Sequence, residues 1–169
     1  MNDKTKRLTT TAVVAALVYV ITMLIVIPVP AIKGAYFNLG DVIIYCAAFL
    51  LGGPYAAIVA ALGSGLADLT LGSALYAPAT VVIKGLMALA AGAITKKPNL
   101  SKYILACVVG GLIMAGGYGL YEVMIFGASA AVLTVVPNLI QAACGIVIAS
   151  ALYKPMQLLR NKIGLRNTK

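Results

Sequence analysis

The chain has 169 residues and a net charge of +9, and 62% of its residues are hydrophobic whereas only 10% are charged. Soluble domains usually carry about 25% charged residues, so lipid must cover part of this protein. The positive charge does not indicate a nucleic-acid partner, because eleven of the thirteen basic residues lie in short segments beside apolar stretches, within residues 4–7, 96–102 and 154–169. This distribution follows the positive-inside rule of membrane proteins.

Six apolar stretches separated by proline, glycine and polar breaks predict an all-α bundle of six transmembrane helices, forming a single domain over residues 1–169. The first stretch has twenty residues without a charge, enough to span about 30 Å of hydrocarbon. Asp41 is expected to cap the second helix, and Pro54 and Pro78 to open the third and fourth. The predicted helices cover residues 8–27, 41–51, 54–71, 78–95, 102–126 and 130–153.

An even number of spans places both termini on one side of the membrane, and the basic segments select the cytoplasmic side. Residues 29–40, 72–77 and 127–129 then form the outer loops, and residues 96–99 form an inner polar break. The prediction is therefore a protein with both ends in the cytoplasm.

The composition excludes several kinds of chemistry. The chain has no histidine, and Cys46, Cys107 and Cys144 lie in apolar runs without a CxxC spacing, so we expect no metal site, disulfide or cofactor. No catalytic constellation and no phosphate-binding GxxxxGK[ST] loop occurs, so we expect no enzyme activity and no ATP hydrolysis by that route.

Charged residues inside the predicted helices are candidate functional residues, because a charge at the centre of a membrane costs at least about 2.5–3.5 kcal/mol. With the polar side chains of the sixth helix they fall in the outer half of the bundle, and the cytoplasmic half has almost no buried polar side chains. This layout is typical of a ligand pocket that opens outward. The residues in question are Asp41, Asp68, Lys84, Glu122, Asn138 and Gln141.

Helical spacing groups several polar residues on shared faces that could converge on one pocket. Tyr36, Phe37 and Tyr76 in the outer loops could close over it. The pairs at this spacing are Thr80 with Lys84, Tyr118 with Glu122, and Asn138 with Gln141. Purely structural roles stay open, since Asp41 could serve only as a cap and Lys84 only as the counter-ion of Glu122 or Asp68.

Over residues 8–153 the chain resembles the substrate-binding S components of energy-coupling factor (ECF) vitamin transporters. It looks most like the subgroup that includes riboflavin, hydroxymethylpyrimidine and pyridoxine-type carriers. The motifs that carry the resemblance are YFNLGD at 36–41, GSGLADL at 63–69, APAT at 77–80 followed by Lys84 and Gly85, Tyr118 with Glu122, and PNLIQ at 137–141.

The resemblance implies a six-helix subunit without enzyme activity, in several passes through a bacterial cytoplasmic membrane. It implies partnership with one transmembrane coupling subunit and two ATPase subunits, and toppling in the membrane to release the substrate inward. Ala12 and Ala16 match an AxxxA motif with which the family docks on the coupling subunit. A stripe of alanines lets another helix approach closely, although internal packing would use the same spacing.

The predicted function is capture of a vitamin or vitamin precursor, with a hydroxymethylpyrimidine- or pyridoxine-like ring first and riboflavin next. The residues predicted to bind it are Asn38, Lys84, Tyr118, Glu122, Asn138 and Gln141. One alternative is a stand-alone ion-coupled carrier in which Asp68, Lys84 and Glu122 form a relay. Another is a membrane-embedded enzyme or assembly factor, against which the lack of histidine counts.

Overall fold

The structure, a computed structural model, describes residues 2–30, 32–97 and 99–163. Pro98 of the predicted polar break and residues 164–169 of the basic tail lie outside the described residues. Within the described part, seven helices and one two-stranded hairpin follow one another. They are α1 (Asp3–Leu24), β1 (Ile27–Pro28), β2 (Tyr36–Phe37), α2 (Gly40–Leu51), α3 (Gly53–Thr70), α4 (Ala77–Ile94), α5 (Leu100–Phe126), α6 (Ala128–Ala151) and α7 (Tyr153–Ile163).

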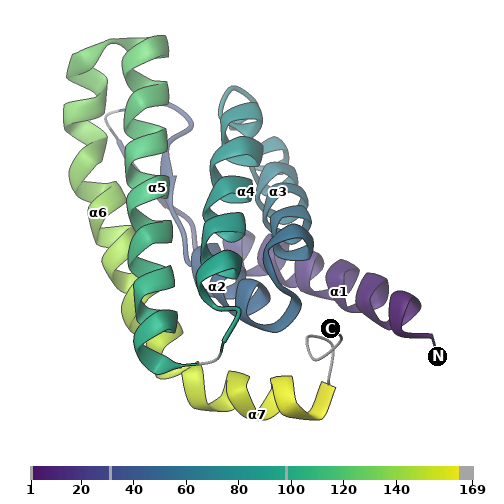
Figure 1. Ribbon diagram of the computed structural model, residues 1–169. Helices are drawn as coiled ribbons and strands as arrows, with labels where there is room; N and C mark the ends of the chain where they lie inside the picture. Colours follow the sequence, from purple (N-terminus) through teal and green to yellow (C-terminus); the bar gives the residue numbers. More distant parts are fainter. Residues whose placement is uncertain (1, 31, 98, 164–169) are drawn as a thin grey trace.

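The helices form two neighbouring pairs, α3 with α4 and α5 with α6, joined by packing of α4 against α5 (Figure 1). Helix α2 contacts α1, α3, α4 and α6, and eleven of its twelve residues are buried, so it is the centre of the bundle. Helix α7 lies across one end, roughly perpendicular to α5 and α6 (Figure 1). The turns that join α3 to α4 and α5 to α6 lie at the opposite end.

The surface of the bundle suits a lipid environment. Leucine, isoleucine and valine side chains are exposed along α1, α3, α4, α5 and α6. Among the described residues, α1, α4, α5 and α6 are long and apolar enough to cross a membrane, whereas α2 is a shorter apolar helix. The count of six spans and the cytoplasmic location of both termini stay predictions.

Helix α1 lies a few residues nearer the N-terminus than predicted. It begins at Asp3, because the Asn2 side chain caps it by accepting a hydrogen bond from the Lys4 amide at 3.4 Å. It ends at Leu24 rather than at residue 27, since β1 pairs in antiparallel fashion with β2. The predicted outer loop 29–40 thus contains the second strand of a short hairpin whose first strand comes directly before the loop, and no local sequence pattern indicated this pairing.

The described part of the basic tail belongs to a seventh helix, α7 (Tyr153–Ile163), that the sequence did not predict, since the last predicted helix ended at residue 153. Arg160 of α7 is buried and donates hydrogen bonds to the carbonyls of Phe49 and Thr95 at 3.4 Å and of Lys96 at 3.3 Å. Carbonyls at helix C-termini lack intrahelical donors, and an arginine satisfies them well. The expectation of almost no buried polar side chains in this half is therefore wrong for Arg160.

Small residues allow close helix crossings, as the sequence of α3 indicated. A Cβ on Gly63 would lie 2.7 Å from the Ala15 carbonyl oxygen of α1, and one on Gly92 of α4 would lie 2.2 Å from the Gly53 amide nitrogen.

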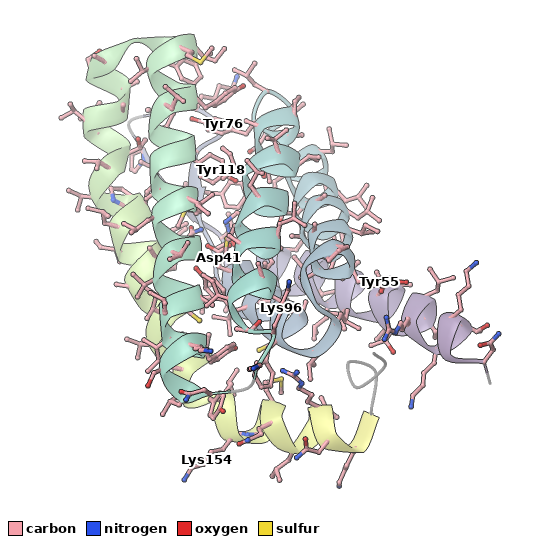
Figure 2. The ribbon with its side chains drawn as sticks, viewed as in Figure 1. Asp41, Tyr55, Tyr76, Lys96, Tyr118 and Lys154 are labelled. Atoms are coloured by element: carbon pink, nitrogen blue, oxygen red, sulfur yellow. The ribbon has the colours of Figure 1, made fainter. Side chains whose placement is uncertain are left out.

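Figure 2 shows Tyr76, Tyr118 and Asp41 following one another along the interior of the bundle, with Lys96 and Lys154 toward the α7 end. The polar interior and the basic end thus lie apart.

Candidate ligand-binding pocket

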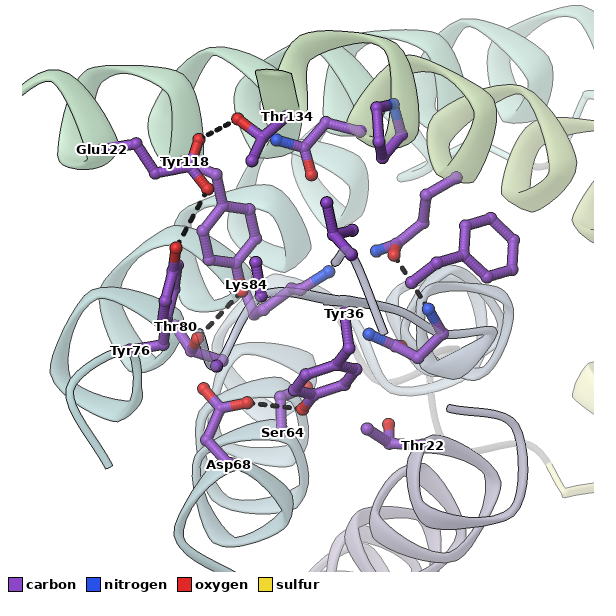
Figure 3. Close-up of a pocket in the computed structure, with 18 residues that line it drawn as sticks. Thr22, Tyr36, Ser64, Asp68, Tyr76, Thr80, Lys84, Tyr118, Glu122 and Thr134 are labelled. Atoms are coloured by element: carbon purple, nitrogen blue, oxygen red, sulfur yellow. Dashed lines mark hydrogen bonds between the residues drawn. The ribbon is translucent and has the colours of Figure 1, made fainter. Parts of the chain in front are cut away.

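A polar cavity lies between α3, α4, α5, α6 and the hairpin (Figure 3). The space between its atoms is about 540 Å³ when the solvent at its opening is included, and the part open to the centre of a water molecule is about 40 Å³. All six residues predicted to bind the ligand line this cavity: Asn38, Lys84, Tyr118, Glu122, Asn138 and Gln141.

Lys84 of the cavity lining forms a buried ion pair with Asp41, which lies behind the lining. Lys84 of α4 donates a hydrogen bond to one carboxylate oxygen of Asp41, and both side chains are 2% exposed. Gln141 Nε2 donates to the other Asp41 oxygen at 2.8 Å, and Gln141 Oε1 accepts from the Asn38 amide at 2.9 Å. A continuous polar chain therefore links α4, α2, α6 and the segment after β2.

Two sequence-based interpretations of these residues are wrong. Lys84 was considered a counter-ion of Glu122 or Asp68, but it pairs with Asp41. Asp41 was expected to cap α2, but the capping position is Leu39 and makes no side-chain cap. Asp41 lies in the first turn with its carboxylate bonded to Lys84 of α4, and this basic partner compensates for burying the charge.

Glu122 is held from two sides by hydroxyl donors. It is 2% exposed, and its two oxygens accept hydrogen bonds from Tyr76, at 3.2 Å, and from Thr134. Tyr118, one turn earlier on α5, shares a hydrogen bond of 2.9 Å with Thr80, and the Lys84 ammonium lies 5.5 Å from the centre of its ring. These contacts fix the carboxylate and the ring before any ligand enters.

Asp68 of α3 faces the same cavity and is 3% exposed. Its Oδ1 accepts a hydrogen bond of 2.5 Å from the Tyr36 hydroxyl. Burial, reinforced by the Asp68 carboxylate, raises the pKa of the Tyr36 phenol, so the phenol stays protonated and donates. Among the described residues Asp68 Oδ2 and Asn138 Nδ2 have no hydrogen-bond partner, although both atoms are buried.

The end of the cavity away from α7 is closed by aromatic residues and loops. Tyr76 packs with Ile32 and Ala130 into a small apolar cluster. Ser73 donates a hydrogen bond of 2.9 Å to the Gly34 carbonyl, and Tyr121 donates to the Leu75 carbonyl. These contacts hold the hairpin segment against the turn before α4, so the cavity is covered on that side.

Sequence reasoning missed several polar residues of the lining. Ser64 lies four residues before Asp68 on α3, and Thr134 lies four residues before Asn138 on α6. Residues four apart share a helix face, so a search along the faces of the charged residues would have found both. Thr22 of α1 also lines the cavity and had no such signal.

Ala12 and Ala16 are exposed on α1, whereas Ala15 is buried in the core. The two alanines therefore do not pack inside this chain. Their docking on a partner stays a prediction.

The described contacts do not join the residues of the alternative ion relay into one network. Lys84 bonds to Asp41, whereas Asp68 bonds to Tyr36. Glu122 bonds to hydroxyl groups rather than to either of the other two.

Apolar helices around a buried polar cavity define a helical membrane protein with a polar interior. Residues 2–158 match the family model described as ECF-type riboflavin transporter, S component. The chain belongs to this family of transporter S components, as its motifs indicated, and is a multi-pass membrane protein.

Two relatives extend this finding. An uncharacterised protein from Pyrococcus woesei is 35% identical over 148 residues, which cover 87% of this chain and 97% of the relative. The thiamine precursor transporter HmpT of Lactococcus lactis subsp. cremoris is 33% identical over 151 residues, which cover 89% of this chain and 87% of HmpT.

Proposed function

We propose that the protein is the substrate-capture subunit of an ECF importer for a vitamin or vitamin precursor. The supporting observation is the convergence of carboxyl, amino and amide side chains from four helices on one cavity inside an apolar bundle. Burying such groups costs free energy unless they bind one another or a ligand. In a family of transporter S components, the cavity is the natural place for the transported molecule.

The proposed ligand is a small heteroaromatic ring of the hydroxymethylpyrimidine or pyridoxine type, with riboflavin as the next candidate. The similarity to a thiamine precursor transporter supports the first choice, and the description of the family model supports the second. Asn138 and Gln141 each carry a donor and an acceptor, so they can bind both kinds of ring edge. Because the chain has no tryptophan, stacking on the ring falls to Tyr118 or another tyrosine or phenylalanine.

This chain has no phosphate-binding loop, so the energy for transport comes from an ion gradient or from other subunits, and we propose the second source. We propose a transmembrane coupling subunit that docks on Ala12 and Ala16, and two ATPase subunits that supply the energy. In this arrangement residues 1–169 form one binding domain of six spans in the cytoplasmic membrane, with both termini inside. Toppling of the subunit would then turn the loaded cavity inward.

The first experiment measures the thermal stability of the purified protein with hydroxymethylpyrimidine, pyridoxine, thiamine and riboflavin. A ligand at 100 times its dissociation constant adds about 2.7 kcal/mol of stability. We expect the largest shift with hydroxymethylpyrimidine or pyridoxine. No shift with any of the four would contradict the proposed ligand class.

A second experiment separates the importer from the ion-coupled carrier. Uptake is measured in cells with and without the coupling and ATPase subunits, and again after the proton gradient is dissipated. We expect uptake to need the partner subunits and to survive loss of the gradient. If the chain takes up ligand without partner subunits, and this uptake stops when the proton gradient is dissipated, the result favours the ion-coupled carrier with its relay of Asp68, Lys84 and Glu122.

A further inference from the structure

Asp68 is the acidic group of the cavity whose bonding is incomplete. Glu122 has a hydroxyl donor on each oxygen, and Asp41 has Lys84 and Gln141. Asp68 has the Tyr36 hydroxyl on Oδ1, whereas Oδ2 has no hydrogen-bond partner among the described residues. The Thr80 hydroxyl lies beside this carboxyl (Figure 3) and interacts with it weakly, but its hydrogen bond of 2.9 Å joins it to the Tyr118 hydroxyl.

The missing partner is a hydrogen-bond donor. An ionised carboxylate only accepts, so Oδ2 can be satisfied by an N–H or O–H group and is repelled by a carbonyl. Lys84 is engaged with Asp41, and no ion pair involves Asp68 in the part of the chain that the structure describes. Since buried polar atoms in native structures nearly always have a partner, Oδ2 is a place where a bound molecule completes the site.

The opposite wall offers the complementary group. Asn138 of α6 also lines the cavity, and its buried Nδ2 lacks an acceptor among the described residues. A molecule between α3 and α6 that satisfies both atoms presents a donor to one wall and an acceptor to the other. An aminopyrimidine has this pattern, because its exocyclic amine only donates and its ring nitrogens accept.

We propose that Asp68 determines specificity by accepting a hydrogen bond from an exocyclic amine of the ligand, while Asn138 donates to an acceptor on the ring. This inference rests on the proposed function and narrows its substrate class to amino-substituted rings. A bond from an amine to a carboxylate is charge-assisted and is stronger than a neutral one. A ring without the amine leaves Oδ2 of Asp68 without a donor. Binding sites discriminate most strongly against ligands that leave a buried polar group unpaired.

The test is a cycle of two ligands and two proteins. Hydroxymethylpyrimidine and its analogue without the exocyclic amine are titrated into the wild type and into Asp68→Ala. We expect the wild type to bind the ligand with the amine about ten- to 100-fold more tightly than the analogue. The dissociation constants of the two ligands for the variant should lie within about threefold of each other. If the variant kept the wild-type preference, Asp68 would not read the amine.

Glu122→Gln is the matched control, since it removes a second buried acid from the same cavity. It should lower the affinity for both ligands by a similar factor and leave the preference unchanged. An equal loss of preference in Glu122→Gln would overturn the assignment, because the overall negative charge of the cavity would then explain the selectivity.

Folding of each variant is checked by its melting temperature without ligand. If Asp68→Ala does not fold, Asp68→Asn replaces it, since it keeps the shape and loses the charge; it should still reduce the preference by about fivefold. A wild type that binds neither ligand would overturn the ligand class of the proposed function and this assignment with it. A wild type that binds both without a preference would overturn only the role of Asp68.

Discussion

Lys84 and Asp41 form a buried ion pair that joins α4 to α2, although 43 residues separate them in the chain. Gln141 adds a hydrogen bond from α6 to the same carboxylate. Buried pairs of this kind contribute little net stability, but removal of one partner leaves an uncompensated charge. The pair and the Gln141 hydrogen bond therefore connect the three helices beside the cavity.

Lys84→Met should destabilise the ligand-free protein by about 3–5 kcal/mol, because Asp41 then stays buried without its cation. The double variant Lys84→Met/Asp41→Asn should recover part of this loss, since no charge is left unpaired. Unfolding of the purified variants in the same detergent measures both effects. Equal stability of Lys84→Met and the wild type would show that the pair is not formed.

Asn138→Ala and Glu122→Gln should each weaken ligand binding by about five- to 150-fold, because one ligand group loses its partner in a closed cavity. Ser150→Ala is the control on α6: its buried hydroxyl has no partner among the described residues and does not line the cavity. Titration with the ligand measures the affinity of each variant, and the melting temperature without ligand shows whether the variant is folded. Normal affinity in both pocket variants would place the ligand elsewhere.

Ala12→Trp or Ala16→Trp should abolish transport and leave ligand binding by the solitary protein intact. Both alanines are exposed on α1, and neither lines the cavity. A bulky ring there would hold a partner helix away from the alanine stripe. Leu17→Trp, at an exposed position on another face of α1, is the control and should retain more transport. Loss of binding along with transport would instead assign the alanines to folding.

Single cysteines at positions 33 and 97 should be labelled from opposite sides of the membrane. Lys33 and Lys97 are both exposed, and the basic residues near Lys97 predict the cytoplasmic side. The background is a variant with alanine at Cys46, Cys107 and Cys144. A membrane-impermeant maleimide on intact cells should reach position 33 only. Labelling of both positions from outside would contradict the predicted topology.

The sequence by itself determined the class of protein and most of the helices. Long apolar runs without a charge are unfavourable in water, so they indicate a membrane protein. Pro54, Pro78 and the break before α5 divide these runs at nearly the positions where the helices begin. It also indicated the residues of the cavity. A polar side chain in an apolar helix has few places to lie, and residues three or four apart share a face.

The tertiary structure decided which of these residues bind one another. Lys84 could have paired with any of three buried acids, and only the placement of α2 against α4 selects Asp41. The same packing leaves one oxygen of Asp68, a residue of the cavity lining, without a partner among the described residues. It also places α7 where Arg160 bonds to the carbonyls of Phe49 and Thr95. Local periodicity assigns a residue to a face of its own helix, but contacts between helices depend on how all of them pack together.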